Sequence, residues 1–529
     1  MATGSAVKRV LGQLPLTAEL DWALRGKAKA AGGFKLEELR EVLPEWVQAA
    51  ENSPLRHESG FKVLIYATLH YWLTHACLIA LGLAGMGHEV TLAYSPFNNW
   101  QKPVDKYDLR KRQLYVEDVL APAQPLLSIV SFSADAPAAP LNADLEAAIE
   151  AVSVRDVQYS LQVEAVDKSS ALFLLRQARN RAAAAQALAW IQREEPDVLI
   201  VPNGLILEFG ALQAVAQHLG LPVVSYEFGE QQERIWLSRG KAVMLQDTDA
   251  MWAAKRDEKF NDTQKKKVQE LFAARQQADL FSNFYRKWQD VPSEGAAKAR
   301  ATLQLDERPI ILLAANVIGD SLTLGRAIFS KNMSEWLQRS LEFFAARDDL
   351  QLVIRVHPGE RNLPGPSVAD LVYDQFSELP AHFRVVAASD PINTYDLIQA
   401  ADLGLVYTTT VGLEMAMSGL PAIVVGRTHY RGKGFTHDPQ SWDEYLTQLN
   451  ECLSNLKAAR LTEEQVEMAW HYAYRFFFDY PQLFPWHLLH FQRNTQEFPL
   501  ADLFSEQGQA QYRESFDILT GRGFAWESA

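Results

Sequence analysis

Three consecutive threonines, Thr408, Thr409 and Thr410, are the residues of this chain best suited to hold an anion. They follow an apolar run of strand length, and Gly412 and Glu414 come next in a helix-length segment. The first N–H groups of a helix are unpaired and its N-terminus carries partial positive charge, so this sequence predicts a phosphate site. Glu414 would accept hydrogen bonds from a ribose. The simpler alternative is a threonine N-cap with a favourable first-turn glutamate.

A second group with possible chemistry is the pair Arg355 and His357, which ends another apolar strand. Pro358 stops that strand and fixes the turn. Arg355 brings a permanent positive charge, and His357 can donate to a phosphate or to a leaving-group oxygen. A lone histidine at a strand end is more often structural. Its expected place on the same sheet edge as the threonines favours a functional role.

A glycine-rich basic loop, residues 426–439, follows the last strand of this half. Its glycines allow a close approach of backbone to a ligand, and its cations suit a phosphate or an acidic sugar. Arg431 and Lys433 are therefore predicted to bind such a ligand. The alternative is a flexible basic surface loop without a ligand.

The first half of the chain offers two groups that can deprotonate a hydroxyl. Glu227 comes at the end of an apolar strand, close to Gly229, and His75 lies shortly after another such strand. Carboxylate and imidazole are common general bases. The predicted catalytic residues are Glu227, His75 and His357. A histidine that only packs within a helix is the alternative for His75.

Two series of strand-length apolar runs position these residues, separated by helix-length segments. This alternation predicts parallel sheets, in which ligands lie at the carboxyl ends of the strands. We therefore expect an α/β protein with two Rossmann-like doubly wound domains facing a cleft. The predicted parts are an N-terminal helical extension, a first and a second Rossmann-like domain and a helical tail, at residues 1–58, 59–295, 296–450 and 451–529. Residues 121–145 read as a loop, and Asp290–Gly295 as a linker.

The composition excludes several classes of protein. With 51 Lys and Arg against 65 Asp and Glu, the formal net charge is −14, which disfavours a broad nucleic-acid surface. Two cysteines make no disulfide framework, so a reducing compartment is expected. The apolar run at 76–87 is too short to cross a bilayer, and the N-terminus lacks the apolar core of a signal peptide. We expect a cytoplasmic protein without a bound metal or cofactor; peripheral contact with the inner membrane face stays open.

The motifs resemble the capsule polysaccharide biosynthesis family, which includes GT-B-fold transferases of 3-deoxy-manno-octulosonic acid (Kdo). The resemblance rests on the His357–Pro358 pair, on Asp390–Gly426 and on His429–Pro439, with good similarity over about residues 195–245 and 350–440. It implies a GT-B-like fold, with residues 59–295 as the acceptor domain and residues 296–450 as the nucleotide-sugar domain. It also implies that His357 and the three threonines contact the phosphate of a nucleotide sugar, and that Glu414 holds its ribose.

The implied activity is metal-independent glycosyl transfer from a nucleotide-activated sugar to a surface or capsular polysaccharide, on a glycan or lipid-linked acceptor. A CMP-linked acidic sugar is the favoured donor, and UDP- and GDP-sugars stay open. The threonine triplet and the stretch Tyr430–Gly434 differ from the family's usual Ser-Thr and aromatic run. Two alternatives remain: a sugar-nucleotide epimerase of the same two-lobe design, and a non-catalytic polysaccharide-assembly protein.

Overall fold

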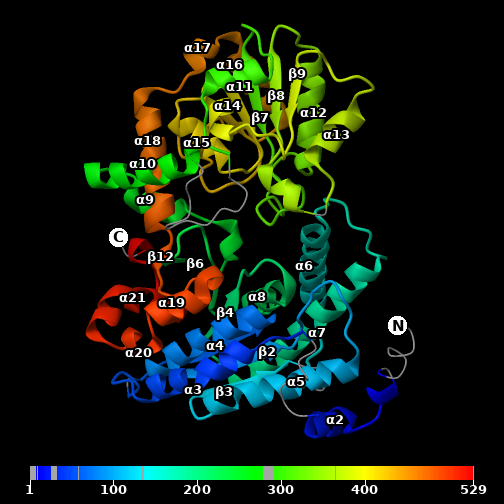
Figure 1. Cartoon of the computed structure of the whole chain (residues 1–529), viewed down its shortest axis with the longest axis vertical. Helices are drawn as coiled ribbons and strands as arrows, with labels where there is room; N and C mark the ends of the chain where they lie inside the picture. The colour runs from blue at the N-terminus through cyan, green and yellow to red at the C-terminus, as the bar shows by residue number, and fades with distance from the viewer. Residues whose placement is uncertain are drawn as a thin grey trace. The chain divides into compact units, whose positions relative to one another are not determined.

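The computed structural model, shown in Figure 1, describes residues 8, 10–25, 33–57, 59–132, 136–277, 291–363 and 365–527. The chain divides into two compact units. The first unit comprises Met1–Asp156, Asp167–Met244 and Gln482–Phe524, and the second comprises Val157–Val166, Leu245–Pro481 and Ala525–Ala529.

The first unit is built on a seven-stranded sheet with the order β12-β6-β5-β4-β1-β2-β3. Strands β1 to β5 run parallel, β6 is antiparallel to β5, and β12 is antiparallel to β6. The strands are β1 Lys62–Thr68, β2 Glu89–Ser95, β3 Leu127–Ser131, β4 Val198–Pro202, β5 Val223–Glu227, β6 Arg234–Arg239 and β12 Gln482–Leu483.

Helices cover this sheet, and α4 packs on β1 and β2 while α8 packs on β4 and β5. The apolar run at 76–87 falls mostly within α4, which is buried along most of its length, as the sequence predicts for a helix that covers a parallel sheet. The helices are α2 Thr17–Arg25, α3 Glu37–Glu51, α4 His70–Gly85, α5 Lys106–Leu120, α6 Ala143–Leu161, α7 Ala171–Glu194, α8 Leu207–Leu219, α19 Phe491–Glu497, α20 Leu500–Leu503 and α21 Glu506–Leu519.

The second unit contains a five-stranded parallel sheet with the order β11-β10-β7-β8-β9. Its hydrophobic core joins the strands to α12 through Trp336, Leu341 and Phe344. The strands are β7 Ile310–Ala314, β8 Gln351–Arg355, β9 Phe383–Val386, β10 Leu403–Val406 and β11 Ala422–Val424. The helices are α9 Asp249–Lys255, α10 Asp262–Gln276, α11 Ala296–Thr302, α12 Met333–Ala345, α13 Val368–Gln375, α14 Thr394–Ala400, α15 Val411–Met417, α16 Trp442–Ser454, α17 Leu456–Ala459 and α18 Glu463–Tyr474.

Each unit has a Rossmann-like strand order, in which the chain winds outward in one direction and then reverses. The predicted α/β class with two Rossmann-like domains is confirmed. Every strand-length apolar run of the two series forms a strand; the nine runs lie at residues 63–67, 90–94, 198–201, 223–226, 310–314, 352–356, 383–387, 403–407 and 422–425. The prediction of a loop at 121–145 is wrong in part, because β3 forms there at the edge of the first sheet. This strand is only partly buried and includes two serines, so it does not form a continuous apolar run in the sequence.

The division into units differs from the predicted domain boundaries chiefly in two places, and the short segments 157–166 and 525–529 also group with the second unit. Residues 245–277 group with the second unit, where α10 packs on α18, rather than ending the first domain. Residues 482–524 return to the first unit, where β12 pairs with β6. The predicted linker begins at residue 290, outside the described residues, and its remainder is irregular. Among the described helices, none is both long and apolar enough to cross a membrane.

Candidate functional site

The threonine loop of the second unit lies at the point where the strand order reverses. The backbone N–H of Thr408, just beyond β10, donates to Oδ1 of Asn316, just beyond β7, over 3.1 Å. Strands β10 and β7 are neighbours, although β8 and β9 intervene in the chain. In open α/β sheets, ligands bind at such a switch point, outside the carboxyl ends of the strands.

Two glycines allow other loops to pack closely on the threonines. A Cβ on Gly426 would lie 2.6 Å from the methyl carbon of Thr408, and one on Gly412 would lie 2.3 Å from the Tyr430 hydroxyl oxygen. The Tyr430 hydroxyl donates to the carbonyl oxygen of Thr409 over 2.6 Å. The loop is therefore held rigidly by packing, as a preorganised binding site requires.

The three hydroxyls of this loop differ in their surroundings. Thr408 is 6% exposed, and its Oγ1 has no hydrogen-bond partner in the described part of the chain. Oγ1 of Thr409 accepts a long hydrogen bond, 3.4 Å, from the N–H of Val411. Thr410 occupies the N-cap position of α15 without a side-chain cap bond. The buried hydroxyl of Thr408 is the group most in need of an external partner, since an unpaired buried polar group is costly.

His357 follows β8, on the other side of β7 from the threonines. Its side chain is half-buried, and its Nδ1 accepts from the N–H of Gly359 over 3.0 Å. In the neutral imidazole this contact puts the proton on Nε2, which becomes a donor. Strands β10 and β8 are two spacings apart, roughly 10 Å, which a phosphate and its sugar can span.

Arg355 lines a pocket of about 170 Å³ beside this histidine. Its guanidinium donates to the carbonyl oxygen of Ala387 over 2.7 Å, and burial lowers its pKa to about 10. The pocket lies at the carboxyl ends of β8 and β9 and includes Pro358, Arg361 and Asp390. It offers two cations, a carboxylate and backbone groups next to the predicted phosphate position.

The carboxylate of Glu414, predicted to bind a ribose, is paired with a protein side chain. Its Oε1 accepts from Nη1 of Arg275 over 2.5 Å, and both side chains are buried. The Arg275 guanidinium also lies over the rings of Phe272 and Phe477, with distances of 4.9 and 4.6 Å to the ring centroids. This is a buried ion pair that fixes α15 to α10, so the predicted ribose contact is not supported by the geometry.

The two predicted cations of the 426–439 loop are also engaged by protein groups. The Arg431 guanidinium donates to the carbonyl oxygens of Val424 and Pro439, and burial lowers its pKa. Lys433 is buried and forms an ion pair with Asp249. Both side chains stabilise the loop in this structure, and neither points to a ligand site of its own.

Glu227 in the first unit has the environment of a general base. Its Oε2 accepts from Nδ2 of Asn203 over 3.1 Å, and its Oε1 accepts from the N–H of Phe228 over 3.1 Å. Burial raises the pKa of Glu227 to about 7. Asn203 has a φ of 58°, so the loop after β4 is held in an unusual conformation beside this carboxylate.

His75 lies within an aromatic cluster and is fully buried. Its Nε2 contacts the carbonyl oxygen of Trp486 over 2.9 Å, and burial lowers its pKa to about 4. This is the environment of a packing histidine, because a base must reach its substrate. The catalytic role predicted for His75 is therefore not supported by its position.

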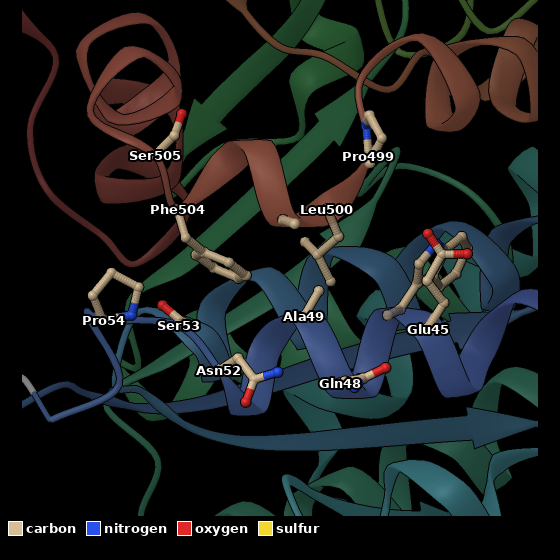
Figure 2. A pocket seen from close by; sticks show the side chains of 12 residues that line it. Glu45, Gln48, Ala49, Asn52, Ser53, Pro54, Pro499, Leu500, Phe504 and Ser505 are labelled. Atoms are coloured by element: carbon tan, nitrogen blue, oxygen red, sulfur yellow. The ribbon is translucent and has the colours of Figure 1, made fainter.

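Figure 2 shows a different pocket of the first unit, about 440 Å³ in volume, between α3 and α20. Phe504 and Leu500 face Gln48 and Asn52 across it. The pocket lies at the end of α3, away from the carboxyl ends of the strands, and its lining includes none of the predicted residues.

Within the described chain, no three His, Cys, Asp or Glu side chains form a group that could hold a metal ion.

Sequence reasoning missed Asn316, Asp390 and Arg275. Asn316 comes two residues after an apolar strand, so the criterion that found the threonines would also have found it. Asp390 lies four residues beyond β9, where that criterion is weaker. Arg275 lies in a charged helix and carries no local signal, because its partner Glu414 is distant in the sequence.

Part of the chain matches a known protein family. Residues 246–469 match the family model described as capsule polysaccharide biosynthesis protein, which confirms the resemblance for that segment. The match includes residues 350–440 but not 195–245, where similarity was also expected. It supports a role in capsule polysaccharide biosynthesis. No curated protein matches the sequence.

The solved structures similar to this chain are remote relatives. KpsC of Thermosulfurimonas dismutans, a β-Kdo 2,4 transferase, is 15% identical, covers 55% of this chain and 82% of its own, and has a TM-score of 0.35. A putative UDP-N-acetylglucosamine 2-epimerase of Listeria monocytogenes is 12% identical, with coverages of 78% and 91% and a TM-score of 0.25. The glycosyltransferase SsfS6 of Streptomyces sp. SF2575 is 11% identical, with coverages of 85% and 99% and a TM-score of 0.21.

Proposed function

We propose that this protein is a glycosyltransferase that moves a sugar from a nucleotide-activated donor, preferably a CMP-linked acidic sugar, to a surface or capsular polysaccharide acceptor. One observation carries the proposal: the threonines after β10 and His357 after β8 share the carboxyl edge of one sheet, on either side of β7. Hydroxyl and imidazole donors at a switch point are suited to a phosphate.

The second unit would bind the donor. The hydroxyl of Thr408 and the Nε2–H of His357 would donate to the phosphate and stabilise the charge that develops on it as the bond to the sugar breaks. The pocket beside His357 would take the nucleoside, with Asp390 in place of Glu414 as the carboxylate for ribose hydroxyls. Arg355 would stabilise the same pocket.

The first unit would activate the acceptor. A hydroxyl of the acceptor would give its proton to the carboxylate of Glu227 while its oxygen forms a bond to the anomeric carbon. The bond between that carbon and the phosphate oxygen would break, and the nucleotide would leave. A carboxylate whose pKa is about 7 is well matched to this task near neutral pH.

The remaining partners follow from the same scheme. The reaction would need no metal, because hydroxyl and imidazole donors would stabilise the charge on the leaving phosphate. The acceptor would be a glycan or a lipid-linked glycan, which would bring the protein to the inner face of the membrane from the cytoplasm. No nucleic acid would take part.

A thermal-shift panel of CMP, UDP, GDP and ADP tests the donor site. A ligand selective for the folded state adds about 2.7 kcal/mol of stability at one hundred times its Kd. We expect CMP to raise the melting temperature most, and Thr408→Val to remove that shift. The control is Thr447→Val on an exposed face of α16, which should keep it. A wild-type protein that no nucleotide stabilises contradicts the proposal.

Product analysis separates the rival functions. A glycosyltransferase releases nucleotide in step with transfer to an acceptor. An epimerase converts its donor without an acceptor, and an assembly protein releases no nucleotide from any donor.

A further inference from the structure

A second pocket of the first unit, about 570 Å³ in volume, lies at the carboxyl end of β1. It is enclosed by the starts of α3 and α4 and by residues 488–493. β1 and β4 are the neighbours at which the order of this sheet reverses, so the pocket occupies the ligand-binding edge of the first unit. Its volume lies within the range of small-molecule sites.

The lining combines an aromatic ring with balanced polar groups. Tyr71 is 41% exposed and presents an aromatic ring at the pocket. Lys35 and Arg493 supply two cations, and Glu37 and Glu38 supply two carboxylates. Such a set gives many donors and acceptors with no net charge, which suits the hydroxyls of a sugar, while an aromatic face suits its C–H groups.

His70 adds a polar atom without a protein partner. Its Nδ1 is inaccessible to solvent and has no hydrogen bond within the described ranges. Burial, with the nearby charge of Lys35, lowers the pKa of His70, so the neutral ring is favoured. The uncharged ring lines the pocket, and its two nitrogens are one donor and one acceptor.

The pocket is connected to Glu227 through packed rings. Phe228, the next residue, lies 4.8 Å from His487 between ring centroids, and His487 lies 5.7 Å from His490 on the pocket wall. On the other side, Phe228 stacks on Trp72 of α4 at 6.4 Å. The candidate base therefore lies behind the wall of this pocket within one unit.

We propose that this pocket binds a sugar residue of the acceptor glycan, with Tyr71 as its stacking platform. The inference rests on the proposed function, because a sugar held here would belong to the glycan that accepts the transferred sugar. Arg493 and Lys35 supply hydrogen-bond donors at its rim.

Saturation-transfer NMR on the full chain tests this assignment, with the methyl glycosides of glucose, N-acetylglucosamine and Kdo as probes and no nucleotide present. We expect signal transfer to the ring protons of at least one sugar with the wild type. Tyr71→Ala should reduce that signal at least fivefold, and Tyr71→Phe should keep most of it. The control, Tyr373→Ala, removes a tyrosine of similar exposure, 53%, on α13 of the second unit and should change nothing.

Two results overturn the proposal: no sugar signal with the wild type, or an equal signal in Tyr71→Ala. The melting temperature of each variant shows whether it is folded. Stabilisation by CMP, measured on the same samples, reports on the donor site separately. If CMP does not stabilise the wild type, the proposed function is contradicted. If the Tyr71→Ala protein keeps both CMP binding and sugar binding, only the assignment of the sugar pocket is contradicted.

Discussion

The backbone N–H of Thr408 donates a 3.1 Å hydrogen bond to Oδ1 of Asn316, and this bond joins the two loops on either side of the switch point of the second sheet. Asn316 is 4% exposed. The buried side-chain oxygen of Asn316 thus binds the N–H of Thr408. This bond fixes the position of the Thr408 hydroxyl. We regard Asn316 as a positioning residue for the donor phosphate.

Replacing Asn316 with alanine should raise the KM for the donor about tenfold and lower kcat less. The N–H of Thr408 would lose its partner, which costs about 1–3 kcal/mol in a buried site. Steady-state kinetics with the donor varied checks this. Asn261→Ala, which removes the cap of α10, should lower stability by about 1 kcal/mol and leave the KM unchanged. Equal donor KM values in both variants would argue against the positioning role.

His357→Asn should lower kcat by about two to three orders of magnitude, the typical loss when one donor to a developing oxyanion is removed. Affinity for CMP should fall much less, because the largest effect is expected in the transition state. The matched control is His382→Asn, at the amino end of β9, where Nε2 contacts the carbonyl oxygen of Phe344. That variant should be less stable but keep its kcat when folded. An equal loss of kcat in both variants would show that His357 has only a structural role.

Transfer should increase with pH through about 7, because Glu227 must lose its proton to act as a base and burial raises its pKa to about 7. Glu227→Gln should remove this dependence together with most of the activity. Because the hydrogen bond from Asn203 lowers the pKa of this carboxyl group, Asn203→Gly should move the acid limb to higher pH. Glycine is chosen because the φ of 58° at this position would strain alanine. An unchanged pH profile in Asn203→Gly would mean that Asn203 does not act through Glu227.

Glu414→Ala should destabilise the protein by about 3–5 kcal/mol, because it leaves the buried guanidinium of Arg275 without its counter-charge. The double variant Arg275→Met with Glu414→Leu should recover much of that loss. Urea unfolding of the two proteins measures both effects. If Glu414→Ala instead keeps its stability but loses CMP binding, the ribose role predicted from the sequence is restored.

Chelation by EDTA should leave the transfer rate unchanged, because hydroxyl and imidazole donors would stabilise the charge on the leaving phosphate without a metal. The assay compares initial rates before and after dialysis against chelator, followed by addition of Mg²⁺ or Mn²⁺. A loss that one of these metals reverses would contradict the metal-independent scheme.

The sequence by itself determined nine of the twelve described strands and the edge at which chemistry is expected. Apolar runs such as Ile310–Ala314 form strands because both faces of a parallel sheet are buried, and this pattern is local. The same rule placed Thr408 and His357 at strand ends. The edge strand β3 was missed because one of its faces is only partly buried, which weakens the signal.

Only the tertiary structure decided which polar groups are engaged by protein partners. The pairing of Glu414 with Arg275, of Lys433 with Asp249 and of His75 with Trp486 joins residues far apart in the sequence. Whether a charge is free for a ligand depends on the distance and burial of such partners, because a buried ion pair forms only where the fold brings both charges together. Local spacing carries no information about that distance, so the sequence could nominate these residues but not assign their roles.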